Sequence, residues 1–113
     1  MSSDRPWDDP QAIASIRFLN ARFTLAERLD KFQEEANEAL DECAAEERKG
    51  NPSEYLRSET IHELADVAVT LHSLLEHPRC GPALRVALRL AYGRLAKRIT
   101  AGEFADRSAP PEG

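Results

Sequence analysis

The chain has 113 residues, enough for one domain, and its formal net charge of −5 argues against a general binder of nucleic-acid polymers or membrane surfaces. Its start lacks the apolar core of a signal peptide, and no apolar run is long enough to span a membrane. Its two cysteines form no spaced metal motif and no disulfide framework, so we expect a reduced, cytoplasmic protein.

The first half of the chain predicts two helices. Residues 1–9 are polar and are expected to be flexible. The segment 10–22 has proline at its first position and apolar residues at helical spacing. Thr24, followed three residues later by Glu27, forms a capping-box signature that opens a second helix, and the sequence at 49–52 (Lys-Gly-Asn-Pro) ends it.

The second half predicts two more helices. A central helix covers residues 59–75, with Ser53 or Ser58 as the candidate cap, and a last helix runs from about 82 to 101. Residues 105–113 are expected to be disordered. With no strand candidate, the fold class is all-α, a single four-helix bundle over residues 10–104. Its surplus of apolar surface predicts a symmetric homodimer.

The central helix combines an apolar surface with a narrow polar stripe. From Leu64 to Leu75 the only charged residue is Asp66, and apolar residues surround the stripe nearly all the way round. Such a helix is usually buried, and a carboxylate on it is costly unless a cation meets it. The stripe consists of Glu59, Glu63, Asp66 and Thr70.

Charge is distributed unevenly over the chain. Residues 27–47 contain nine acidic residues against two basic ones, whereas residues 79–102 contain six basic residues and no acidic one. Two interpretations are open: a pair of solvated, mutually attractive faces, or an acidic metal site opposite a basic phosphate site.

Two pairs of carboxylates have the spacing of neighbours on a helix face. Glu35 and Glu38 form one pair, and Glu63 and Asp66 form the other. If the two helices pack antiparallel, the four groups converge, and each close pair then costs about 4 kcal/mol at 4 Å and an effective dielectric of 20. A hard cation such as Mg²⁺ or Mn²⁺ relieves that repulsion and leaves room for water and phosphate.

These carboxylates also carry a family resemblance. The segment Glu34–Glu38, then 24 residues, then Glu63–Asp66 resembles the EExxE…ExxD signature of MazG-like, all-α nucleoside triphosphate pyrophosphohydrolases, and Lys31 extends the likeness. The resemblance covers roughly residues 12–104. It implies Mg²⁺-dependent hydrolysis of a nucleoside triphosphate to the monophosphate and pyrophosphate, by a dimer or a dimer of dimers.

The resemblance also implies roles for individual residues. The metal ligands would be Glu35, Glu38, Glu63 and Asp66. One of the glutamates, Glu35 or Glu38, or a metal-bound hydroxide would deliver the attacking water. The phosphate-binding residues would be Arg94, Lys97 and Arg98, from the basic last helix.

Two rival hypotheses remain open at this point. One is a non-enzymatic helical interaction module whose acidic and basic faces mediate association. The other is a protein of the same fold that binds nucleotide as a sensor without hydrolysing it. The sequence does not single out a preferred base or sugar.

Overall fold

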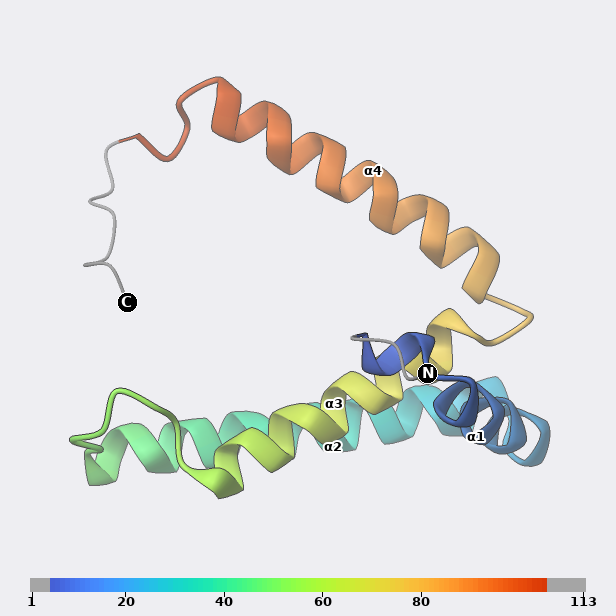
Figure 1. Cartoon of the computed structure of the whole chain (residues 1–113), viewed down its shortest axis with the longest axis horizontal. Coiled ribbons are helices and arrows are strands. Elements are labelled where there is room, and N and C mark those ends of the chain that lie inside the picture. Colours follow the sequence, from blue (N-terminus) through green and yellow to red (C-terminus); the bar gives the residue numbers. More distant parts are fainter. Residues whose placement is uncertain (1–4, 106–113) are drawn as a thin grey trace. The chain divides into compact units, whose positions relative to one another are not determined.

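The structure, a computed structural model, describes residues 5–105, and every regular element in that range is a helix (Figure 1). The expected all-α class is therefore confirmed for the described part of the chain. Of the termini expected to be flexible, residues 1–4 and 106–113 lie outside it, whereas residues 5–9 lie inside and include a short 3₁₀-helix. The elements are the 3₁₀-helix η1 (Pro6–Asp8) and the α-helices α1 (Pro10–Arg22), α2 (Leu25–Lys49), α3 (Ser58–Leu75) and α4 (Gly81–Thr100).

The predicted boundaries of α2 are confirmed. Thr24 accepts a hydrogen bond from the Glu27 backbone N–H through its hydroxyl (3.1 Å), and the Glu27 carboxylate accepts one from the Thr24 N–H (2.8 Å), so the capping box is complete. At the other end Gly50 has φ 74°, a left-handed conformation that favours glycine and ends the helix.

The prediction that Ser53 or Ser58 caps α3 is wrong. Arg57 is the N-cap residue and its side chain makes no capping hydrogen bond. Ser58 is already the first helical residue, and the Ser53 hydroxyl accepts a hydrogen bond from the Tyr55 N–H inside the preceding loop. The loop is instead held by a glutamate from α2.

That glutamate is Glu46, which is 7% exposed. It accepts hydrogen bonds from the Thr60 hydroxyl (2.5 Å), the Asn51 amide (2.8 Å) and the Arg57 N–H (3.0 Å). The Thr60 bond, followed by the Asn51 bond, holds the pKa of Glu46 below its ordinary value, because both donors favour the ionised form. This anchor joins the end of α2 to the start of α3.

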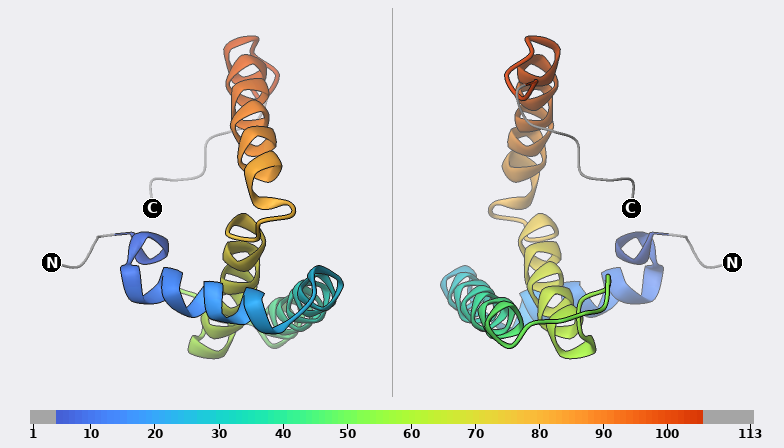
Figure 2. Two further views of the ribbon diagram at one scale, coloured as in Figure 1. Left: turned by 90° about the vertical axis from the view of Figure 1, so that its right-hand side faces the viewer. Right: turned by 90° about the vertical axis from the view of Figure 1, so that its left-hand side faces the viewer.

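The described chain divides into two compact units. The first, ending at Pro82, contains α1 to α3 and is called the α1–α3 unit; the second begins at Ala83 and contains nearly all of α4. Within the α1–α3 unit, α2 and α3 run antiparallel side by side, and α1 lies across the pair near the start of α2 (Figures 1 and 2). None of the described helices combines the length and hydropathy that crossing a bilayer requires.

A tight turn follows α3 inside the first unit. The Gly81 N–H donates to the His77 carbonyl (2.6 Å), and the glycine lies against the Leu75 carbonyl oxygen. A side-chain Cβ at position 81 would collide with that oxygen. Glycine is therefore required here by close backbone approach.

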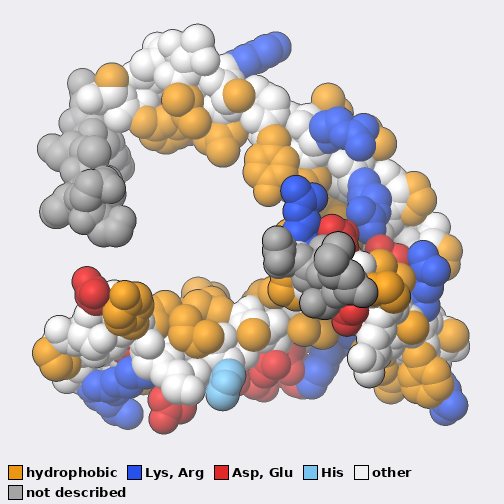
Figure 3. Space-filling view, in the orientation of Figure 1, with side chains coloured by type: hydrophobic (Ala, Val, Ile, Leu, Met, Phe, Trp, Pro, Cys, Tyr) orange, Lys and Arg blue, Asp and Glu red, His pale blue; other side chains and the backbone are white. Residues whose placement is uncertain are grey.

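The expectation that α3 is buried on nearly every side is not met within the α1–α3 unit. Its polar residues Thr60 and Thr70 are buried, whereas Ile61, Leu64 and Leu71 are 41–49% exposed. Glu63 and Asp66 of the polar stripe lie beside Glu35 of α2, whereas Glu59 is exposed. Within the unit, α1 and α2 do not cover the apolar positions. Hydrophobic side chains are accordingly prominent on the surface of the unit (Figure 3).

Candidate metal centre

Three of the four predicted metal-binding carboxylates come together. Glu35 on α2 and Glu63 and Asp66 on α3 each offer an oxygen atom, and these oxygens lie within 4.8 Å of one another. The antiparallel packing of the two helices produces this convergence, as the spacing of the acids predicted. We call these residues the carboxylate trio.

Two oxygens of the trio are buried without a hydrogen-bond donor from the described residues. They are Glu35 Oε2 and Glu63 Oε2, and Glu35 as a whole is only 9% exposed. Buried acceptors are almost always satisfied in folded proteins, and an ionised one without a partner is costly. Carboxylate oxygens are the ligands that Mg²⁺ and Mn²⁺ prefer, so the trio fits a hard divalent cation.

The electrostatics of the trio also favour a cation. Burial raises the pKa of Glu63, and the negative charges of Glu38, Asp66, Glu35 and Glu42 raise it further. The folded chain thus holds negative charges close enough to oppose the ionisation of Glu63. A divalent cation between them would reverse that effect.

One positive charge already meets the trio. Lys31 Nζ lies 2.8 Å from Glu34 Oε1 and 3.1 Å from Glu35 Oε1. These hydrogen bonds, with Glu34 contributing most, raise the pKa of Lys31. Lys31 therefore compensates part of the negative charge of Glu35, but it leaves Glu35 Oε2 unpaired.

The fourth predicted ligand, Glu38, stands apart from the trio. It is exposed on α2 and contributes no oxygen to the group of three. Its negative charge nevertheless raises the pKa of Glu63, next in effect to burial. Its roles as ligand and as catalytic base stay predictions.

The predicted phosphate-binding residues lie in the second unit. Arg94, Lys97 and Arg98 are exposed on α4. Arg98 forms a two-point interaction with Glu103, with N–O distances of 2.8 and 2.7 Å, and its guanidinium lies 5.0 Å from the centre of the Phe104 ring. A phosphate-binding role for these residues stays a prediction.

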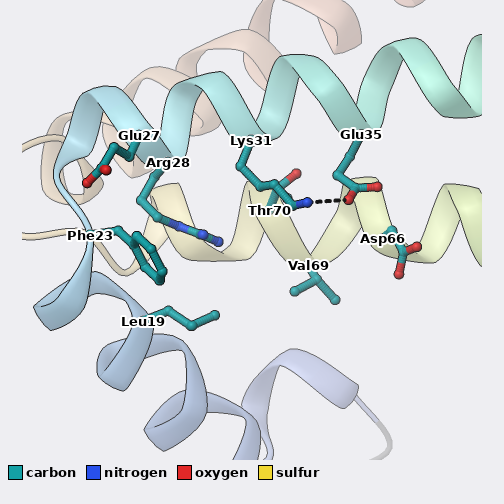
Figure 4. Close-up of a pocket in the computed structure, with 9 residues that line it drawn as sticks. All are labelled: Leu19, Phe23, Glu27, Arg28, Lys31, Glu35, Asp66, Val69 and Thr70. Carbon is teal, nitrogen blue, oxygen red and sulfur yellow. Dashed lines mark ion pairs between the residues drawn. The ribbon is translucent and has the colours of Figure 1, made fainter.

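A cavity of about 610 Å³ adjoins the trio inside the α1–α3 unit (Figure 4). Glu35 and Asp66 line one end, and the apolar side chains of Leu19 and Phe23 line the other. Its size is that of a small-molecule site. The cavity therefore offers carboxylates and an apolar wall to one ligand.

Arg28 also lines this cavity, although the sequence alone did not indicate it as a site residue. It is 7% exposed, and its Nε–H donates to the Ser73 hydroxyl (3.0 Å). The position of Arg28 in the sequence could have indicated this role, because Arg28, Lys31 and Glu35 follow one another at steps of three and four along one face of α2.

Comparison with known proteins identifies no relative. The chain matches no protein-family model, no curated protein and no solved structure. The interpretation of the site therefore depends on its residues and their geometry.

Proposed function

We propose that this protein is a Mg²⁺- or Mn²⁺-dependent nucleoside triphosphate pyrophosphohydrolase, producing the monophosphate and pyrophosphate. The observation that carries the proposal is the pair of buried, unpartnered oxygens on Glu35 and Glu63, within a trio completed by Asp66. The resemblance of the EExxE…ExxD residues to MazG-like proteins supports the same function. The adjoining cavity supplies space for a nucleotide.

In this proposal the trio holds the metal ion, which would neutralise phosphate charge when bound. Lys31 balances one carboxylate charge of the trio. Glu38, exposed and outside the trio, accepts the proton of the attacking water. The water oxygen bonds to one of the two phosphorus atoms beside the α–β bridging oxygen, the bond from that phosphorus to the bridging oxygen breaks, and the monophosphate and pyrophosphate separate.

The decisive experiment measures pyrophosphate release from a panel of ribo-, deoxyribo- and modified triphosphates, with and without Mg²⁺. We expect release with Mg²⁺ only, and a loss of at least about a hundredfold in Glu63→Gln and Asp66→Asn. Matched controls are Glu47→Gln and Asp41→Asn, exposed acids on α2 that should retain activity. Unchanged release in the two trio variants would refute the proposal.

A binding measurement separates loss of metal from loss of chemistry. At a Mg²⁺ concentration 100 times its dissociation constant, the folded state gains about 2.7 kcal/mol. In a domain of this size each kcal/mol raises the melting temperature by roughly 4–8 °C. Wild type should show this shift, and Glu63→Gln should lose it while folding normally without metal, because charge repulsion is relieved.

We also propose that the protein is a homodimer or a dimer of dimers. The α1–α3 unit leaves Ile61, Leu64 and Leu71 exposed along one face of α3, and contiguous apolar surface of this kind marks association sites. The same surface favours the rival hypothesis of a non-enzymatic interaction module. That rival predicts association without a Mg²⁺-induced thermal shift, and a nucleotide sensor predicts binding without product.

A further inference from the structure

Arg28 is a buried cation without a carboxylate partner in the described part of the chain. Over residues 5–105 no acidic side chain forms an ion pair with it; its contacts are the Ser73 hydroxyl and the face of the Phe23 ring, 5.9 Å from the guanidinium carbon to the ring centre. The nearby Glu27 carboxylate is occupied by the Thr24 N–H of the capping box. A buried charge without an opposite charge is costly, so its retention requires an explanation.

The surrounding residues fix the orientation of the Arg28 side chain. Ser73 is fully buried; its hydroxyl accepts from Arg28 Nε and donates to the Asn20 side-chain oxygen (2.6 Å). The Asn20 amide in turn donates to the Ser73 carbonyl oxygen (2.9 Å). Helices α1, α2 and α3 thus hold Nε, and the remaining guanidinium donors extend into the cavity, where Figure 4 shows the side chain.

The position of Arg28 relative to the trio suits a ligand with several charges. Arg28 lies three residues before Lys31 and seven before Glu35. These steps correspond to about 4.5 and 10 Å along the helix axis. An anion bound at Arg28 would therefore be separated from the trio by Lys31 along the helix, but it would lie in the same cavity.

We propose that Arg28 forms an oxyanion subsite that binds a phosphate group of the substrate, or of the pyrophosphate product, away from the metal-binding trio. Arginine presents a planar fork of N–H donors that matches phosphate oxygens. This inference rests on the proposed function for the identity of its ligand. It assigns a phosphate contact to the α1–α3 unit itself, in addition to the basic residues of α4.

The test titrates inorganic pyrophosphate into the protein, once with EDTA and once with Mg²⁺, by calorimetry. In whichever condition the wild type binds, Arg28→Gln should weaken binding roughly ten- to hundredfold, and Arg28→Lys should fall between. The control Arg48→Gln removes an exposed arginine from the far end of α2 and should bind as wild type does. Equal affinity in wild type and Arg28→Gln, or no wild-type binding in either condition, would overturn the proposal.

A second measurement needs no variant and remains decisive if Arg28→Gln fails to fold. The Arg28 Nε–H is held by a buried hydroxyl, so we expect a resolved ¹H–¹⁵N signal that shifts on addition of pyrophosphate, while that of Arg48 does not. An unshifted Arg28 signal would overturn the subsite, as would a shift caused by nucleosides but not by pyrophosphate. Neither result depends on turnover, so failure of the subsite and failure of the proposed enzyme are distinguishable.

Discussion

Replacing Ser73 by alanine tests the contact that joins α1, α2 and α3. The hydroxyl is fully buried and makes two hydrogen bonds, accepting from Arg28 Nε (3.0 Å) and donating to the Asn20 side-chain oxygen (2.6 Å). Alanine removes both and keeps the backbone acceptor that the Asn20 amide uses. The change thus isolates one oxygen atom.

The expected cost follows from these two bonds. A hydrogen bond to a charged group contributes about 1.5–3 kcal/mol, and one between neutral groups about 0.5–1.5 kcal/mol. Because Arg28 and Asn20 are left without their partner in a buried place, we expect Ser73→Ala to lower the free energy of unfolding by about 2–4 kcal/mol. It should also weaken pyrophosphate binding, since Arg28 loses its support.

Urea denaturation followed by far-ultraviolet circular dichroism measures the change. The matched control is Ser15→Ala, whose exposed hydroxyl donates only to the Gln11 carbonyl one turn earlier (2.9 Å), so its effect should stay within about 0.5 kcal/mol. A loss in Ser73→Ala no larger than that of the control would refute the reasoning, because the hydroxyl would then not hold the three helices together.

Three further substitutions test other contacts. Glu46→Gln should lower the free energy of unfolding at pH 7, because hydrogen bonds lower the pKa of Glu46 in the folded protein. This loss of stability relative to wild type should be complete above about pH 4.3 and should disappear as the pH falls through the lowered pKa. Urea titrations at several pH values measure it. Gly81→Ala should cost about 1–3 kcal/mol by scanning calorimetry, because the new Cβ meets the Leu75 carbonyl oxygen. Leu64→Glu should raise the dimer dissociation constant roughly tenfold or more, measured by light scattering.

Each of these three predictions can be contradicted. A loss of stability in Glu46→Gln that does not change with pH would mean that the ionisation of Glu46 does not stabilise the fold. For the glycine, the control Gly93→Ala lies in an open part of α4 and should stabilise the helix by about 0.5–1 kcal/mol, so equal effects at both positions would exclude the collision. A wild type that is monomeric at high concentration would remove the proposed dimer.

The sequence was sufficient to predict the helices and all three members of the carboxylate trio, because both depend on local spacing. Pro10, the Thr24 capping box and Gly50 mark boundaries through their own backbone chemistry. The pairing of Glu35 with Asp66 needed only antiparallel packing of two amphipathic helices.

The burial of Arg28 and the exposure of the apolar positions of α3 were beyond sequence reasoning. An arginine on an acidic helix is usually an exposed partner for neighbouring acids. Its burial depends on Ser73, 45 residues later, which is in turn bonded to Asn20, 53 residues before it. Likewise, the apolar residues of α3 outnumber its polar ones, so the sequence predicted burial on nearly every side of the helix, whereas Ile61, Leu64 and Leu71 are exposed within the α1–α3 unit.

The outward apolar face of α3 has a consequence for how the protein behaves at different concentrations. Among the described residues of the α1–α3 unit the buried hydrophobic side chains are few, namely Ile16, Ala39 and Leu74, while Ile61 and Leu64 are exposed. Much of the hydrophobic free energy of the sequence is therefore gained only when another surface covers that face. In the proposed homodimer, dilution should therefore lower the apparent melting temperature and make the dissociated chains more susceptible to proteases.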